Sequence, residues 1–368
     1  MNVIDLFAGC GGLSLGFTQA GFSIDKAVEF DSTIANTYMI NHPSTKMFVK
    51  DVGVLVKDDV FHEGDANIVI GGSPCQGFSM VGARTRKGFV DDPRNYLFKQ
   101  YFNVVRKVKP MAFVMENVKG LMTMRHGEFF KELLKTFSNP VDDVVYDLHY
   151  KVIKATDFGV PQKRERLFII GSRKKVSNFD ELFDLTKAEI RKQYPNFFDR
   201  VTVRDAIGNL PEVTDSGEVK NPKPQTAYQY YLSTTSPVLT NHIKTKYSAI
   251  TVDRMSRVAN GANFTSLKEK INSVYSGSFG RLCWDEPATT ITTRFDTPAC
   301  GRYIHPSENR TLSPREAARI QSFPDSFVFH GSKTSIRKQI GNAVPPKVSY
   351  FLARLIKNIL KVRRFDGC

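Results

Sequence analysis

Cysteine is scarce in this chain of 368 residues: there are five, and no two form a C-x-x-C pair. Their odd number and wide spacing argue against a disulfide framework and against a zinc site, and they fit a reducing cytosol. No run of about 18 apolar residues is present, so we expect no membrane span. The first residues, "MNVIDLFAGCGG", lack a basic segment and a cleavage site, which argues against a secretory signal. These absences favour a cytosolic protein that holds no metal.

Acidic residues are outnumbered by basic ones. Lysine and arginine total 52 and aspartate and glutamate 37, which leaves a formal net charge of +15. A surplus of this size favours a polyanionic partner, and nucleic acid is the leading candidate. A basic protein with an ordinary solvated surface remains the alternative on charge alone.

The first half of the chain alternates short apolar runs with stretches of helical spacing. Fully apolar strands that alternate with helices predict an α/β, Rossmann-like fold with a mostly parallel sheet covered on both faces. The expected strands are "NVIDLF", "IDKAVEF", "ANIVIGG", "MAFVMENV", "LHYKVIKATDF" and "RLFIIGS". From about Arg173 to residue 305 the alternation gives way to polar segments with strand-like pieces such as "YSAITVD" and "ATTITTRF". We therefore predict a second, smaller, mainly β or irregular domain, followed by a closing amphipathic helix that returns to the sheet.

A glycine-rich turn follows the first expected strand. Gly9, Gly11 and Gly12 allow a tight turn and a close approach of a ligand to the backbone. Glu29, at the end of the second strand, can accept hydrogen bonds from ribose hydroxyls, and Asp51 falls near the end of a third strand, within reach of an adenine ring. The G-x-G-x-x-G spacing is incomplete, so a plain strand–turn–helix with a surface acid is the alternative to an adenosine-type site.

The loop "GGSPCQGFS" places Cys75 directly after Pro74 and between glycines. Pro74 fixes the backbone and the glycines keep the surroundings open, at the edge where open α/β sheets bind ligands. A thiol in such a position can react as the thiolate. The alternative is an inert buried cysteine, the usual fate of this residue.

Two more groups are predicted at the same edge. Glu116, in "MENV", ends the next apolar strand and can donate or share a proton. Arg164 and Arg166, in "QKRER", are two residues apart, so a single strand would point both to one face and into a cleft. A capping acid and a solvated charge run are the plainer interpretations.

Thiol, carboxyl and guanidinium groups beside an adenosine-type site form a specific set, and the chain resembles the bacterial DNA (cytosine-5) methyltransferases. The matching segments occur in the order of that family and span nearly the whole chain. They are "DLFAGCGGLSLGF", Glu29, Asp51, "GGSPCQGFS", "RNYLF", "ENV", "QKRER", "RTLSPREAARIQSFPD" and "QIGNAVPP".

The resemblance implies a covalent mechanism for methylation of cytosine in DNA. Cys75 would add to carbon 6 of a flipped-out cytosine and so activate carbon 5 toward the methyl group. Glu116 would protonate or hydrogen-bond ring nitrogen 3, Arg164 would hold the base carbonyl oxygen, and Arg166 would orient the loop and its acid.

The resemblance also implies S-adenosyl-L-methionine as the cofactor, S-adenosyl-L-homocysteine as its product, and no metal. Glu29 would bind ribose and Asp51 the adenine amino group. The whole expected cofactor set is Phe7, Gly9, Gly11, Gly12, Glu29, Phe30, Asp51, Pro74, Asn342 and Val344.

Three parts of the chain are expected to have different functions. Residues 1–171 would form the catalytic and cofactor-binding domain, residues 172–304 the target-recognition domain, and residues 305–368 a return segment that completes the first. Hydrogen bonds from arginine to guanine are the commonest specific contacts between proteins and DNA bases. Arginines of the middle domain are therefore candidates for contact with double-stranded DNA. The expected DNA-binding set is Gln76, Ser79, Arg254, Arg257, Arg281 and Arg294.

Three rival functions are weighed against this one. A nicotinamide-dependent enzyme with a catalytic cysteine predicts a complete glycine motif and a histidine partner, and the matched motifs contain neither. A non-catalytic relative would have lost Cys75, Glu116 or the glycine turn. A tRNA cytosine-5 methyltransferase of the same fold needs only a small recognition region, whereas about 130 residues favour a reader of duplex DNA. The resemblance also implies a setting in a bacterial restriction–modification system or as an orphan modification enzyme. We expect a monomer in the bacterial cytosol that acts at the nucleoid, contacts no membrane and, in the first of these settings, pairs with a cognate restriction endonuclease.

Overall fold

The computed structural model describes residues 1–73, 97–138, 144–269, 271, 273 and 275–361. The chain forms two compact units. The sheet unit comprises Met1–Lys154, Glu165–Pro195 and Val348–Cys368, and the second unit comprises Ala155–Arg164 and Asn196–Lys347. These bounds differ from the functional division expected above: residues 172–195 belong to the sheet unit, and residues 305–347 belong to the second unit.

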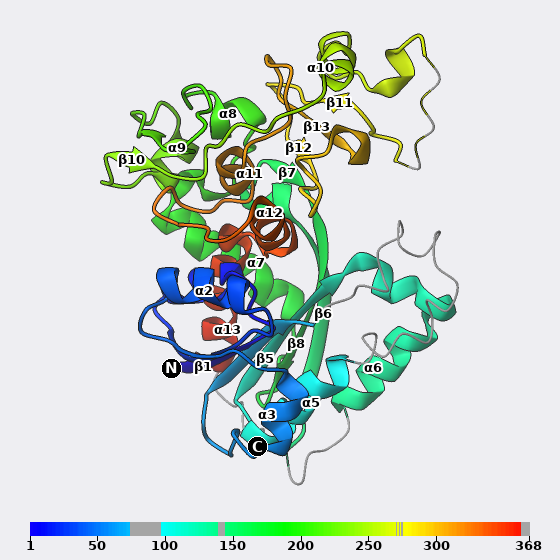
Figure 1. Cartoon of the computed structure of the whole chain (residues 1–368). Coiled ribbons are helices and arrows are strands. Elements are labelled where there is room, and N and C mark those ends of the chain that lie inside the picture. The colour runs from blue at the N-terminus through cyan, green and yellow to red at the C-terminus, as the bar shows by residue number, and fades with distance from the viewer. Residues whose placement is uncertain (74–96, 139–143, 270, 272, 274, 362–368) are drawn as a thin grey trace. The chain divides into compact units, whose positions relative to one another are not determined.

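A seven-stranded sheet with the strand order β3-β2-β1-β4-β5-β8-β6 forms the centre of the sheet unit (Figure 1). β8 is antiparallel to its neighbours β5 and β6, and the remaining pairs are parallel. Most residues of β1, β4 and β5 are buried, which explains why these strands are apolar on both faces. The strands are β1 (Asn2–Leu6), β2 (Ser23–Val28), β3 (Lys46–Phe48), β4 (Ile68–Gly72), β5 (Ala112–Val118), β6 (Asp147–Lys154) and β8 (Glu165–Ser172).

Helices cover both faces of this sheet (Figure 1). On one face, apolar side chains of α3 (Val52–Lys57), α5 (Leu97–Val108) and α6 (Glu128–Ser138) form a continuous core with the strands. The other helices of the unit are α1 (Gly12–Gln19), α2 (Ser32–Asn41), α7 (Phe179–Gln193) and α13 (Pro346–Lys361). The closing helix α13 contacts α1, where the Ser349 hydroxyl donates to the Leu13 carbonyl. The predicted α/β, Rossmann-like fold is confirmed. Among the described residues, no helix is both long and apolar enough to cross a membrane.

The second unit consists of short elements joined by irregular chain. "YSAITVD", predicted as a strand, instead contributes to helix α10, and the region predicted to be non-helical also contains α7 of the sheet unit. The helices are α8 (Val203–Ile207), α9 (Ala227–Leu232), α10 (Ala249–Ser256), α11 (Pro314–Ile320) and α12 (Lys333–Asn342). The strands are β7 (Gln162–Lys163), β9 (Val219–Lys220), β10 (Val238–Leu239), β11 (Gly280–Arg281), β12 (Ala288–Thr289) and β13 (Arg302–Ile304).

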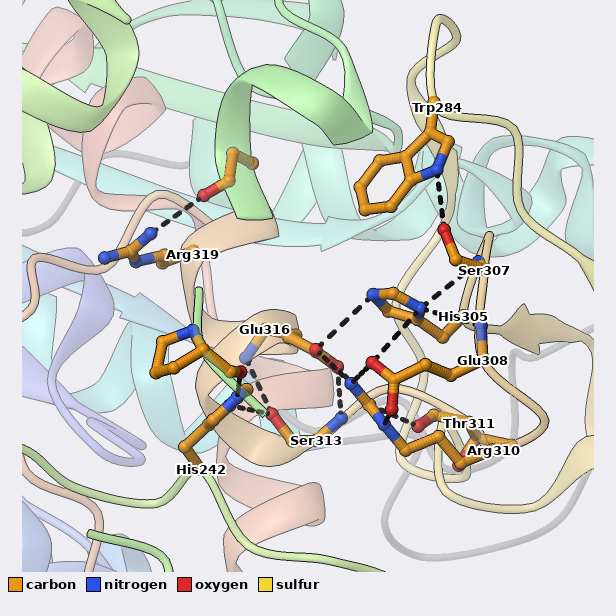
Figure 2. A network of polar contacts seen from close by, with 12 residues as sticks. His242, Trp284, His305, Ser307, Glu308, Arg310, Thr311, Ser313, Glu316 and Arg319 are labelled. Atoms are coloured by element: carbon orange, nitrogen blue, oxygen red, sulfur yellow. Dashed lines mark hydrogen bonds and ion pairs between the residues drawn. The ribbon is translucent and has the colours of Figure 1, made fainter. Parts of the chain in front are cut away.

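A buried polar network stabilises the second unit in place of a large sheet (Figure 2). The Arg310 guanidinium donates to both carboxylate oxygens of Glu316 at 2.8 Å and to Glu308 at 2.7 and 2.8 Å. Glu316 also accepts the Ser313 amide and closes a capping box at the start of α11. Ser313 in turn contacts Nδ1 of His242 at 2.9 Å. Burial alone would raise the pKa of Glu316, but the charge of Arg310 outweighs it and lowers that pKa to about 2.

Candidate active site

The segment with the predicted nucleophile follows the carboxyl end of β4 in sequence. Four predicted site residues of this segment lie outside the described residues: Pro74, Cys75, Gln76 and Ser79. A Cβ on Gly71 would lie 2.3 Å from the Leu6 carbonyl oxygen, so glycine is required there for β4 to pair with β1.

Gly72 and Glu116 are register partners on β4 and β5. A Cβ on Gly72 would lie 3.0 Å from Oε2 of Glu116, so the missing side chain makes room for the carboxyl group. On the next residue pair, the Asn117 side-chain amide donates to the Ser73 hydroxyl at 3.4 Å. Ser73, the last described residue before Cys75, therefore lies directly beside the Glu116–Asn117 stretch of β5.

Arg166 holds the Glu116 carboxylate. Its Nε lies 3.0 Å from Oε1 of Glu116, and both side chains are largely buried. Arg166 stands on β8, opposite Val118 at the end of β5, so the antiparallel pairing brings the guanidinium to the carboxyl edge. Another guanidinium nitrogen donates to the Glu165 carbonyl at 2.8 Å. A charged donor is thus fixed against the candidate acid.

Arg164 occupies a different environment. It lies between β7 and β8, outside both strands, so the prediction that one strand carries Arg164 and Arg166 on the same face is wrong. Arg164 is 2% exposed, and its NH1 donates to the carbonyls of Ile291 and Gly341 at 3.1 Å each. These contacts hold the backbone of the second unit.

The glycine turn after β1 is held by Glu29. Oε2 of this carboxylate accepts the Gly9 amide at 2.9 Å, and Oε1 accepts the Asp31 amide at 3.0 Å. Gly9 and Gly11 have φ angles of 56° and 94°, in the left-handed region that favours glycine. Burial raises the pKa of Glu29, and the two amide contacts oppose that rise.

Other expected cofactor residues surround this turn. Phe7 has a φ of 55°, an uncommon value for a residue with a side chain. Gly12 is the first residue of α1, where Gly11 is the cap. Phe30 follows Glu29 and is 75% exposed. Asp51 caps α3 by accepting the Gly53 amide at 2.7 Å.

Asn342 and Val344 lie in the second unit. Asn342 is the last residue of α12 and is exposed, whereas Val344 is buried.

Asp5 is a residue of the site that sequence reasoning did not single out. It is buried on β1 beneath the glycine turn, where Oδ2 accepts the Ser14 hydroxyl at 2.6 Å. The Ser14 hydroxyl also contacts the Tyr38 hydroxyl at 2.8 Å, so the three side chains connect β1, α1 and α2. Oδ1 of Asp5 has no hydrogen-bond partner within the described part of the chain. The signal in the sequence was an acid inside the otherwise apolar run "NVIDLF".

The four arginines predicted to contact DNA fall into distinct environments. Arg281 is 5% exposed and donates to four backbone carbonyls and one side-chain amide oxygen, so the structure does not support it as a DNA contact. Arg254 and Arg257 both pair with Glu269, at 3.3 and 2.7 Å. Arg294 is exposed, and its side chain forms no ion pair with the described residues.

Comparisons with known proteins place this site in a family. The model of the C-5 cytosine-specific DNA methylases matches residues 1–358. The Type II methyltransferase M.DdeI of Desulfomicrobium norvegicum is 34% identical over 97% of this chain and 88% of its own length. M.XorII of Xanthomonas oryzae pv. oryzae is 36% identical over 97% of this chain and 85% of its own length.

Solved structures agree with this placement. A prophage-encoded E. coli protein, assigned as a DNA modification methyltransferase, superimposes with a TM-score of 0.76 at 29% identity and covers 98% of this chain and 100% of its own. The Dnmt2 methyltransferase of S. pombe, at 17% identity and a TM-score of 0.61 over 98% of each chain, shares the fold. The chain described here therefore belongs to the C-5 cytosine-specific DNA methylases and is a DNA (cytosine-5) methyltransferase.

Proposed function

We propose that the protein transfers a methyl group from S-adenosyl-L-methionine to carbon 5 of a flipped-out cytosine in a specific double-stranded DNA sequence, through a covalent adduct with Cys75. The observation that carries the proposal is the Glu116–Arg166 pair at 3.0 Å, beside the point where the Cys75 loop leaves β4. An acid held by a cation next to a thiol-bearing loop fits the activation of a pyrimidine ring.

The residues around the glycine turn fit the cofactor that the methyltransferase family implies. Apart from its two chain neighbours, no described residue has an atom within 4 Å of a Cβ added on Gly9, so the described chain leaves open space at this turn. Each Glu29 oxygen accepts one backbone amide and keeps capacity for a ribose hydroxyl. Asp51 would bind the adenine amino group, and Phe30, Asn342 and Val344 remain members of the expected cofactor set. The bound cofactor supplies an electrophilic methyl group on sulfur.

Residues of the chain would carry out separate steps of the methyl transfer. The Cys75 thiolate adds to carbon 6, while Glu116 donates a proton or hydrogen bond to ring nitrogen 3 so that the ring can accept the electron pair. Carbon 5 would accept the methyl group as the methyl–sulfur bond breaks. Loss of the carbon 5 proton to a base, with return of the nitrogen 3 proton to Glu116, would then expel the thiolate and restore the ring. Arg166 keeps Glu116 in place, and its NH2 group, which has no hydrogen bond to the described residues, can donate to the base carbonyl.

Methyl transfer from labelled cofactor to a pool of duplex DNA tests this proposal, with bisulfite sequencing to locate the product. We expect Cys75→Ala to abolish transfer but retain DNA binding, because phosphate contacts do not need the thiol. Glu116→Gln should lower the single-turnover rate about 100-fold or more, within the range for a general acid. Full turnover by Cys75→Ala would rule out the adduct, and methylation of a tRNA pool in place of DNA would favour the RNA alternative.

The setting is also a proposal. The bacterial Type II relatives support an enzyme that acts on DNA alongside a cognate restriction endonuclease. That it acts as a monomer in the cytosol remains our expectation. Co-expression with a candidate endonuclease would test that pairing, because the methylated sequence should resist cleavage.

A further inference from the structure

The segment Pro161–Arg164 forms a strand-like support for residues 288–291 within the second unit. β7 and β12 pair in parallel, with Gln162 opposite Ala288 (Figure 1). The Ala288 amide donates to the Pro161 carbonyl at 2.9 Å, and the Thr290 hydroxyl donates to the Lys163 carbonyl at 2.8 Å. The backbone of "QKR" thus fixes the course of a segment more than 120 residues away in sequence.

Two side chains of the same support hold Ile291 from both sides. Oε1 of Gln162 accepts the Ile291 amide at 3.2 Å, and NH1 of Arg164 donates to the Ile291 carbonyl at 3.1 Å. Gln162 is fully buried and is itself held by Gln321, at 2.6 Å. Arg164 also reaches the Gly341 carbonyl. Both polar groups of one peptide residue are therefore bound by side chains of "QKRER".

The chain after Ile291 is held at two further points. Gly341 packs closely on Thr292, because a Cβ added to Gly341 would lie 2.4 Å from the carbonyl carbon of Thr292. Asp296 accepts two hydrogen bonds from Arg337, at 2.7 and 2.9 Å. Residues 291–296 therefore form a loop, here called the clamped loop, that is fixed at its start and near its end.

Arg294 stands between these fixed points and is exposed. Its charge is not offset by an ion pair with the described residues, in contrast to Arg254 and Arg257, which share Glu269. An uncompensated guanidinium on a rigid loop loses little conformational entropy when it binds, and it suits a guanine edge or a phosphate. The chain's net charge of +15 is consistent with such a partner.

We propose that Gln162 and Arg164 are positioning residues that hold the clamped loop, and that Arg294 on this loop contacts the DNA. The inference rests on the proposed function and gives Arg164 a role other than contact with the target base. It separates the two arginines of "QKRER": Arg166 acts beside Glu116, and Arg164 acts on DNA recognition through the loop.

Hydrogen exchange of the protein without DNA or cofactor tests the clamp directly. We expect Arg164→Ala and Gln162→Leu to increase amide exchange in the peptides covering 288–297, with Arg164→Lys intermediate because one donor is retained. Arg294→Gln should leave this exchange unchanged. Unchanged exchange in folded Arg164→Ala or Gln162→Leu would overturn the clamp, and if Arg164→Ala fails to fold, Arg164→Lys and Gln162→Leu carry the test.

DNA affinity and steady-state kinetics test the consequence. We expect Arg294→Gln to raise the Kd for the methylated sequence about 10-fold to 100-fold. Arg164→Ala should raise the Kd and the KM for DNA similarly, with kcat at saturating DNA within about threefold of wild type. The Kd of the double variant, Arg164→Ala with Arg294→Gln, should be at most about three times the larger of the two single-variant Kd values. Both changes act on one loop, so their effects should not multiply. Arg204→Gln, which removes an exposed arginine paired with Asp285 at 2.8 Å, is the matched control and should leave the Kd unchanged.

Besides unchanged hydrogen exchange, two results would overturn the proposal: an unchanged Kd for Arg294→Gln, or a loss of kcat with unchanged KM for Arg164→Ala, as expected of a base contact. The proposed function fails separately. If the wild type binds DNA without transferring methyl groups, that function is wrong, and the exchange and affinity measurements still decide the role of the clamped loop.

Discussion

Replacement of Asp5 by asparagine tests the electrostatics beneath the glycine turn. Burial raises the pKa of this carboxyl group from 3.8 to about 7, although the hydrogen bond from Ser14 opposes the rise. The folded protein therefore keeps a proton that the unfolded chain releases near pH 4. The stability contribution is complete below about pH 4 and is lost as the pH rises to about 7. Asparagine has no charge to titrate, so Asp5→Asn should lack this loss.

The size of the effect follows from the two pKa values. A group that titrates at 3.8 when unfolded and at about 7 when folded lowers the free energy of unfolding by about 4 kcal/mol in total. About 2.5 kcal/mol of this falls between pH 5 and pH 8. The side chain is 1% exposed, so little of the effect is screened by solvent.

Urea unfolding followed by circular dichroism at pH 5, 6, 7 and 8 measures this effect. Native-state amide exchange in β1 reports the sheet unit alone, which matters because two units need not unfold together. The free energy of unfolding of Asp5→Asn minus that of wild type should grow by about 2.5 kcal/mol from pH 5 to pH 8. Asp184→Asn, which removes an exposed carboxylate on α7, should leave the pH dependence as in wild type. A constant difference between Asp5→Asn and wild type over this range would refute the reasoning.

Three further changes test the packing and the charge networks. Glu316→Gln removes the buried one of the two carboxylates that pair with Arg310 and leaves Glu308 as its carboxylate partner. We therefore expect a loss of about 3 kcal/mol in unfolding free energy at pH 7 by urea unfolding, the low end of the range for breaking a buried pair. Because the pKa of Glu316 is lowered to about 2, wild type should itself lose stability as the pH falls from about 4.5 toward 2. Gly16→Ala places a Cβ 2.4 Å from the Cβ of Ser349, so it should lower the free energy of unfolding by about 1–3 kcal/mol and lower the Tm. An unchanged Tm would contradict the close contact of α1 with α13. Burial lowers the pKa of Lys347 to about 7, so this residue should make wild-type Tm rise between pH 7 and pH 10. Lys347→Met should not show that rise, and an identical pH profile would count against the assignment.

The sheet could be predicted from the sequence because its strands are buried on both faces and read as apolar runs. The same logic located Glu116 at the carboxyl edge. It failed for "YSAITVD", where Ile250 and Val252 are β-branched and suggested a strand. Those side chains are exposed on α10, and the helix starts because the Ser248 hydroxyl accepts the Thr251 amide. A local cap thus outweighed the β-branched pattern in this segment.

The arginines show a second limit of sequence reasoning. Arg281 and Arg294 look alike in sequence, yet Arg281 donates inward to carbonyls of residues 23 to 27 positions away, and Arg294 faces solvent. A carbonyl group exists at every residue, so no residue pattern reveals which guanidinium will be enclosed by several of them. The net charge of +15 counts both kinds equally. It therefore indicates a polyanionic partner, but which arginines can reach that partner depends on the acceptors that the folded chain places around each one.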